Sequence, residues 1–92
     1  MTLEERFNIA ADIVRSIVKQ INDEILAQLY GYFKQAREGN IAFSRPSILN
    51  MRGRKMWDAW KSKENMAKED VMSKYIDIVY ALTNRKELLE EE

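Results

Sequence analysis

The residues with the clearest chemical potential lie in the middle of the chain, where aromatic rings and cations occur together. Tyr30 and Lys34 are four residues apart, a spacing that puts both side chains on one face of a helix. Residues 29–61 carry seven basic and two acidic side chains, a net charge of +5, whereas the segments before and after them carry −2 and −3. A chain that is neutral overall but positive at its centre is suited to binding one anion at one place.

The composition argues against catalysis. The chain has no cysteine and no histidine, so it lacks thiolate chemistry and the most common general base and metal ligand. No spacing pairs the carboxylates of Asp23, Asp58 and Asp70. We therefore expect a binding protein and not an enzyme, with no metal and no cofactor.

The length of 92 residues allows a single domain, residues 1–92, with a modest core. No apolar run approaches the ~20 residues of a membrane-spanning helix, so we expect no integral membrane insertion. The acidic start, MTLEERFN, lacks the features of a signal peptide. We expect a cytoplasmic protein.

The apolar spacing predicts helices that position these residues, and no segment alternates as a strand does. The first helix runs from about Leu3 to Gln20, with Thr2 as its N-cap. We expect Asn22 to close it and Asp23 to cap a second helix that ends at Glu38, before Gly39. The apolar stripe of the first helix contains Phe7, Ala10, Ala11 and Val14.

Two further helices complete the predicted all-α fold. Residues 40–52 are too apolar to extend freely into solvent, so we expect an ordered loop packed over the helices. A short third helix follows at about Gly53–Lys63. The fourth runs from about Ala67 to Leu89, with Asn65 as the nearest capping candidate and Arg85 and Lys86 in its last turn, where cations favour the helix dipole.

Three stretches, LYGYFKQAREGN, SRPSILNMRGRKMWDAW and KEDVMSKYIDIV, resemble the acyl-CoA-binding protein family. In that family Y-x-x-Y-K-Q-A-x-x-G, R-P, G-K-x-K-W-x-A-W and K-E-D-A-M-x-x-Y-I recur in this order and at these separations. The resemblance runs without a gap from about Phe7 to Val79. It implies an up-down-down-up four-helix bundle that binds medium- to long-chain fatty acyl-CoA esters without catalysis. Such a protein is an intracellular carrier of these esters, and we expect a monomer.

The resemblance also implies roles for matching positions. Tyr30 and Lys34 would contact the 3′-phosphate of coenzyme A, and Tyr75 would contact the nucleotide part. Phe33 takes the place of an aromatic residue that lies against the adenine, and it lacks the hydroxyl of that residue. On spacing alone, however, Phe33 also fits ordinary core packing.

The basic positions of the family are only partly kept. Arg15 and Arg52 replace basic residues and retain the charge, whereas Met56 replaces a lysine that pairs with the 3′-phosphate. Losing one charge-assisted hydrogen bond costs about 1.5–3 kcal/mol, or about tenfold to a hundredfold in affinity. Either Arg52 or Arg54 compensates, or Lys34 holds the phosphate alone.

The acyl tail needs a dry groove, and the first helix offers small residues at the centre of an apolar stripe. We expect Phe7, Ala10, Ala11 and Val14 to form this groove, because alanines let a hydrocarbon chain approach the backbone closely. Ala10 and Ala11 also fit simple helix–helix contact.

Two other functions fit the basic centre. The first is a nucleic-acid-binding helical domain, although the pI of about 6.3 and the acidic flanks argue against it. The second is a helical adaptor that presents a groove to a partner protein or to lipid. Our leading expectation is fatty acyl-CoA as the partner, with no nucleic acid.

Overall fold

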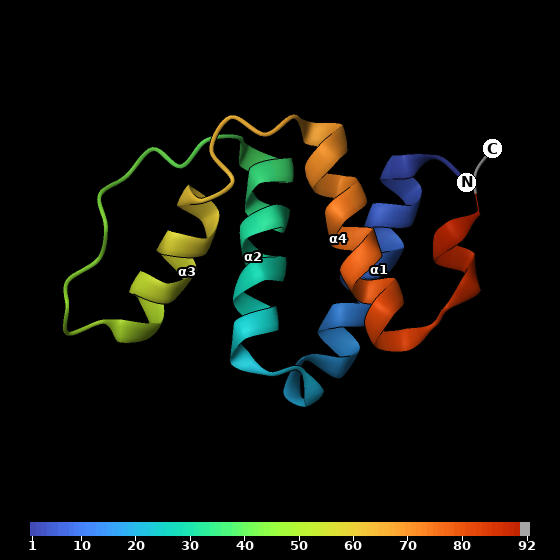
Figure 1. Cartoon of the computed structure of the whole chain (residues 1–92), viewed down its shortest axis with the longest axis horizontal. Coiled ribbons are helices and arrows are strands. Elements are labelled where there is room, and N and C mark those ends of the chain that lie inside the picture. The colour runs from blue at the N-terminus through green and yellow to red at the C-terminus, as the bar shows by residue number, and fades with distance from the viewer. Residues whose placement is uncertain (91–92) are drawn as a thin grey trace.

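The computed structural model describes residues 1–90, and this range contains helices and no strand. Its α-helices are α1 (Leu3–Ile17), α2 (Asp23–Glu38), α3 (Met51–Lys61) and α4 (Lys68–Thr83), with short 3₁₀ helices η1 (Val18–Gln20) and η2 (Lys86–Leu89). In Figure 1, α1 and α4 run one way and α2 and α3 the other. The predicted up-down-down-up four-helix fold is therefore confirmed.

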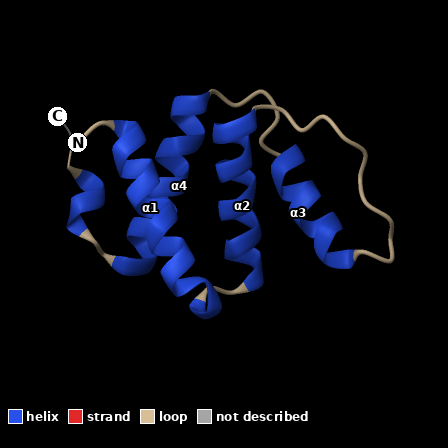
Figure 2. Cartoon of the chain, turned by 180° about the vertical axis from the view of Figure 1, so that it is seen from behind, coloured by secondary structure: helices blue, strands red, loops and turns tan. Residues whose placement is uncertain are grey.

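The hydrophobic core lies where α1, α2 and α4 meet. Its largest fully buried side chains are Phe7, Leu29, Val71, Val79 and Leu88. By contrast, α3 packs chiefly against α2, on the side of α2 away from α1, as Figure 2 shows. None of the helices in the described part of the chain combines the length and apolarity needed to cross a membrane.

The first two helices begin at side-chain caps. The Thr2 hydroxyl accepts a hydrogen bond from the Glu5 amide at 3.0 Å, and the Glu5 carboxylate accepts one from the Thr2 amide at 2.8 Å, which confirms Thr2 as the N-cap. For α2 the capping residue is Asn22, whose Oδ1 accepts from the Ile25 amide at 2.9 Å. The predicted cap at Asp23 was wrong, because Asp23 is already helical.

The predicted bounds of α3 and α4 need correction. Asn50 caps α3, so that helix begins at Met51 and not at Gly53. At the other end of the chain, α4 stops at Thr83 because Asn84 adopts a left-handed conformation (φ 56°). This turn allows Leu88, which is fully buried, to fold back onto α1, and Arg6 of α1 donates to the Leu88 carbonyl at 3.2 Å.

Two further predictions for α4 were wrong: the place of two cations in its last turn, and Asn65 as its N-cap. Arg85 and Lys86 lie beyond the helix and not in its last turn. Asn65 has a φ of 71° in the preceding turn, and the N-cap position belongs to Ala67, which offers no side-chain hydrogen bond. The amide of Asn65 instead donates to Asn40 Oδ1 at 2.7 Å.

The connection between α2 and α3 is ordered, but most of its apolar side chains are not packed over the helices as expected. Ile41 is buried. Four other large apolar residues in or next to the connection are exposed: Phe43, Ile48, Leu49 and Met51.

Candidate ligand-binding site

A mostly apolar hollow of about 240 Å³ opens where the four helices come together. Residues distant in sequence converge on it, because each helix supplies part of the wall. Its lining residues are Ala11, Val14 and Arg15 of α1, Leu26, Leu29, Tyr30 and Phe33 of α2, Met56 of α3 and Tyr75 of α4. A hydrocarbon-lined hollow with a cation and two hydroxyls at its wall suits a ligand that has both a greasy and a polar part.

Tyr75 is the most buried polar residue of this hollow. It is 3% exposed, and its ring packs edge-on against Phe7 at a centroid distance of 5.1 Å and tilted against Phe33 at 6.1 Å. Burial raises the pKa of the Tyr75 phenol to about 12, and the positive charge of Arg15 partly opposes this shift. Tyr75 therefore presents a neutral hydroxyl at physiological pH, beside the Arg15 cation.

Lys34 does not line this hollow but lies next to a residue that does. Its Nζ is 6.0 Å from the ring centroid of Tyr30 and 5.3 Å from that of Trp60. Its ammonium also forms an ion pair with Glu38, one helical turn away. Tyr30 thus stands between Lys34 on one side and the hollow of Tyr75 on the other.

Met56 occupies the boundary between three hollows. It lines the hollow of Tyr75, a larger one of about 610 Å³ and a third of about 400 Å³. Arg52, one turn earlier on α3, lines the two latter hollows and shares the third with Tyr30. The thioether at position 56 is therefore central to the site, although it carries no charge.

The other basic residues of α3 are engaged elsewhere. Arg54 Nε donates to the carbonyl of Pro46 at 2.8 Å, and Lys55 forms an ion pair with Glu24 of α2. Arg52 has neither an ion pair nor a hydrogen bond to another side chain within residues 1–90. Of the two arginines considered as substitutes for the missing lysine, Arg52 is thus the one that is available.

The four residues of α1 that we expected to form an acyl groove differ in whether they reach the hollow. Phe7 and Ala10 are 1% and 0% exposed, and both are packed inside the core. Ala11 and Val14 remain at the edge of the hollow. The apolar path instead continues past Leu26 and Met56 into the 610 Å³ hollow, where the exposed residues Ile48 and Met51 form part of the wall.

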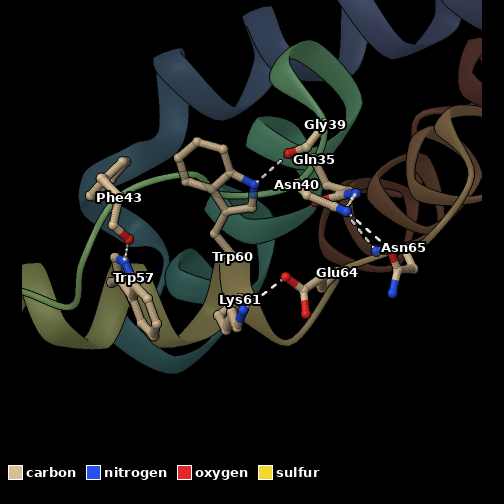
Figure 3. Close-up of polar contacts among 9 residues, drawn as sticks. All are labelled: Gln35, Gly39, Asn40, Phe43, Trp57, Trp60, Lys61, Glu64 and Asn65. Atoms are coloured by element: carbon tan, nitrogen blue, oxygen red, sulfur yellow. Dashed lines mark hydrogen bonds and ion pairs between the residues drawn. The ribbon is translucent and has the colours of Figure 1, made fainter.

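The placement of α3 depends on the loop that precedes it. Figure 3 shows Trp60 Nε1 donating to the Gly39 carbonyl and Trp57 Nε1 donating to the Phe43 carbonyl, each at 2.9 Å. Arg45 adds a two-pronged contact to the Asp58 carboxylate, at 2.9 and 2.8 Å. These bonds join α3 to its own loop and help to position Met56 opposite α2.

A second cluster in Figure 3 ties the far ends of the loop and of α3 together. Asn40 Oδ1 accepts from Gln35 Nε2 at 2.9 Å and from the Asn65 amide, and Asn40 Nδ2 donates to Asn65 Oδ1 at 3.0 Å. Trp60 is buried, and the Lys34 ammonium lies 5.3 Å from the centroid of its ring. The contact of Trp60 with Lys34 depends on a loop geometry that spacing along the sequence does not reveal.

The chain is similar to known proteins over nearly all of its length. The family model described as "Acyl CoA binding protein" matches residues 4–79. The chain is 40% identical over 91 residues to acyl-CoA-binding domain-containing protein 2 of Oryza sativa subsp. japonica, covering 99% of this chain and 93% of that protein. It is 39% identical over 92 residues to the acyl-CoA-binding protein of Brassica napus, covering 100% and 94%.

Solved structures agree with this similarity. The crystal structure of Oryza sativa acyl-CoA-binding protein 2 superposes with a TM-score of 0.84 at 36% identity, covering 92% of each chain. That of an acyl-CoA-binding protein from Moniliophthora perniciosa gives a TM-score of 0.74 at 30% identity, covering 97% of this chain and 90% of the other.

Proposed function

The chain belongs to the acyl-CoA-binding protein family, and we propose that it binds medium- to long-chain fatty acyl-CoA esters without transforming them and carries them as a cytoplasmic pool. The observation that carries this proposal is the meeting of Arg15, Tyr30 and Tyr75 at one hydrocarbon-lined hollow. A coenzyme A ester has a polyanionic head and an apolar tail, so its binding site must offer a cationic surface and an apolar surface close together.

The head of the ligand would lie around Tyr30. Lys34 Nζ is 6.0 Å from the centroid of the Tyr30 ring, and Arg52 shares the 400 Å³ hollow with Tyr30, so each would contribute a cation for the 3′-phosphate. Binding would require Lys34 to exchange Glu38 for the phosphate. The aromatic rings of Tyr30 and Trp60 already hold the ammonium in place, which lowers the ordering cost of that exchange.

The nucleotide would also contact Arg15, Phe33 and Tyr75. Phe33 supplies an apolar ring at the wall of the hollow, stacked on Phe7 with a centroid distance of 5.7 Å. Tyr75 keeps its proton and so donates a hydrogen bond. Arg15 holds its charge at the rim, where it pairs with Asp12.

The acyl tail would lie along Ala11, Leu26 and Met56 and enter the 610 Å³ hollow between α2 and α3. Each methylene removed from water contributes about 0.8 kcal/mol. The thioether of Met56 adapts to a flexible hydrocarbon chain more readily than a lysine would. Met56 would therefore favour the tail at the expense of one phosphate contact.

Isothermal titration calorimetry with palmitoyl-CoA tests the proposal. We expect one ligand per chain, and about tenfold or greater weakening by Lys34→Ala and by Arg52→Ala, because each removes a charge-assisted hydrogen bond. The matched control is Lys61→Ala, which removes a lysine of α3 that pairs with Glu64, away from the hollows. Absence of binding by the unmodified protein, with its helical content intact, would overturn the proposal.

Binding of the palmitoyl ester of dephospho-coenzyme A, which lacks the 3′-phosphate, distinguishes the contribution of Arg52 from that of Lys34. If Arg52 replaces the missing lysine, this ligand binds the unmodified protein about tenfold or more weakly than palmitoyl-CoA, and Arg52→Ala reduces that difference. A small penalty that Arg52→Ala leaves unchanged would assign the phosphate to Lys34 alone.

A further inference from the structure

The turn that leads into α3 displays three large apolar side chains to water. Ile48, Leu49 and Met51 are 67%, 92% and 72% exposed, and we refer to these three residues as the α3 tip. Figure 1 places this turn at the end of the molecule opposite η2. Neighbouring exposed apolar residues of this size mark an interaction surface more often than scattered ones do.

The α3 tip is held in its exposed position by hydrogen bonds. The Leu49 amide donates to the Ser47 hydroxyl at 3.1 Å, and the Asn50 amide donates to the Ser47 carbonyl at 2.8 Å. Asn50 then caps α3, and Arg54 holds the Pro46 carbonyl. The local structure thus presents the apolar side chains outward.

The charges around the α3 tip identify the class of partner. Residues 40–58 contain four basic side chains and one acidic side chain in a chain of zero net charge. Two of these cations are paired with carboxylates, Arg45 with Asp58 and Lys55 with Glu24. Arg52 and Arg54 have no carboxylate partner in the described part of the chain, while Asp23 is the one further acid that lines the adjoining hollow.

The direction of α3 adds to this positive potential. The N-terminus of the helix, with its partial positive charge, lies at the α3 tip, and its first turn contains no acidic residue. The partner must therefore accept protruding apolar side chains and carry negative charge close to them. A membrane surface with anionic lipids meets both requirements, because its headgroups give way to apolar side chains and its phosphates attract the arginines.

We propose that the α3 tip docks on the surface of membranes that contain anionic lipids. Ile48 and Met51 also line the 610 Å³ hollow, so docking would bring the opening of that hollow to the lipid surface. If the proposed function is correct, an acyl chain would then pass between bilayer and protein with little exposure to water. The docking itself does not depend on that function.

Co-sedimentation with phosphatidylcholine vesicles, with and without phosphatidylserine, tests the proposal. We expect the protein to sediment with the anionic vesicles at low salt, to be released by high salt, and to ignore pure phosphatidylcholine. Leu49→Ser should lower the partition coefficient about tenfold, the value of one buried leucine. The matched control is Leu89→Ser in η2, which changes another exposed leucine at the far side of the molecule and should alter partitioning less than about twofold.

Three results would each overturn docking by the α3 tip: no sedimentation of the unmodified protein at any lipid concentration, equal partitioning of Leu49→Ser, or equal loss in Leu89→Ser. The first is also the result expected if the tip serves a partner protein. Palmitoyl-CoA titration of both variants separates this test from the proposed function. Unchanged palmitoyl-CoA affinity of Leu49→Ser together with its lost sedimentation supports docking. Sedimentation that depends on Leu49, in an unmodified protein that does not bind palmitoyl-CoA, would contradict the proposed function alone.

Discussion

The two sides of α2 are stabilised in different ways. On one side, α1 and α4 meet α2 through a dry core in which Phe7, Val71 and Val79 are at most 1% exposed. On the other side, α3 packs against α2 with Ala59 and Trp60 buried. The loop before α3, however, leaves most of its large apolar side chains exposed and is joined to α3 by hydrogen bonds from tryptophan and arginine side chains to its carbonyls. Burial of large apolar side chains contributes much more free energy than single hydrogen bonds that water can replace. We infer that the first side forms a rigid wall and the second an adjustable one.

The candidate site lies at the seam between these two regions. Arg15 and Tyr75 come from the rigid side, and Met56 and Arg52 come from the adjustable side, with Tyr30 of α2 between them. An adjustable wall lets a hollow open for a long ligand and close over it, while the rigid wall keeps the polar contacts in register.

The largest difference between the regions should appear when one aromatic ring is removed from each. Phe7→Ala removes a ring that is 1% exposed, stacked on Phe33 and packed edge-on against Tyr75, and should lower the free energy of unfolding by about 3–5 kcal/mol. Phe43→Ala, in the loop and 57% exposed, should cost less than about 1 kcal/mol. Urea denaturation measures both, and equal costs would contradict the distinction between a rigid and an adjustable side.

High pH should lower the free energy of unfolding, because Tyr75 is buried on the rigid side. Its pKa is raised to about 12 in the folded protein, whereas a tyrosine in the unfolded chain titrates near 10. The folded state therefore keeps a proton that the unfolded state loses, and stability that is complete below about pH 10 falls by about 2–3 kcal/mol as the pH rises to about 12.

Comparison with Tyr75→Phe isolates this contribution. Burial lowers the pKa of Lys63, which acts in the opposite sense at alkaline pH, but that effect is common to both proteins. Absorbance at alkaline pH should show one late-titrating tyrosine that is missing in Tyr75→Phe. If both proteins lost the same free energy of unfolding between about pH 10 and about pH 12, Tyr75 would be hydrated in solution.

The packing of α3 against α2 depends on a glycine. A methyl group added at Gly31 would lie 2.6 Å from the Ala59 carbonyl oxygen, and backbone atoms cannot yield as a side chain can. Gly31→Ala should therefore displace α3 and lower the free energy of unfolding by about 1–3 kcal/mol. The higher helix propensity of alanine offsets about 1 kcal/mol of this loss. Hydrogen exchange should accelerate in α3 while α4 stays protected, and palmitoyl-CoA affinity should fall.

The sequence predicted the bounds of α2 better than those of α4. For α2, Gly39 indicated the end of the helix at Glu38, and the predicted start was wrong only in the cap, which is Asn22 and not Asp23, because local signals and packing agree there. For α4, local signals favoured a longer helix. A tertiary contact decided otherwise, since burying Leu88 against α1 requires the left-handed turn at Asn84.

Periodicity also could not say what covers an apolar stripe. Phe7 and Ala10 share the stripe of Ala11, yet the first two are covered by protein and the third lies at the edge of a hollow. The apolar loop residues were expected to be packed. The course of the loop is instead set by hydrogen bonds that two tryptophans donate to its carbonyls, and this course leaves Leu49 exposed. Whether a given apolar side chain is covered depends on contacts between distant segments, and the spacing of residues along one helix gives no information about those contacts.

The smallest expected effect concerns those two tryptophan hydrogen bonds. Trp60→Phe removes the donor to the Gly39 carbonyl and should cost about 1–2 kcal/mol, because the lost bond is partly buried and the smaller ring leaves a gap. Trp57→Phe removes the more exposed bond to the Phe43 carbonyl, which water can replace, and should cost less than about 0.5 kcal/mol. Because Trp60 also supports the Lys34 ammonium, Trp60→Phe should weaken palmitoyl-CoA binding more than Trp57→Phe does, as calorimetry would measure. If the two variants were equal in both stability and affinity, the loop would be held by its remaining contacts, and Lys34 would not depend on Trp60 for its position.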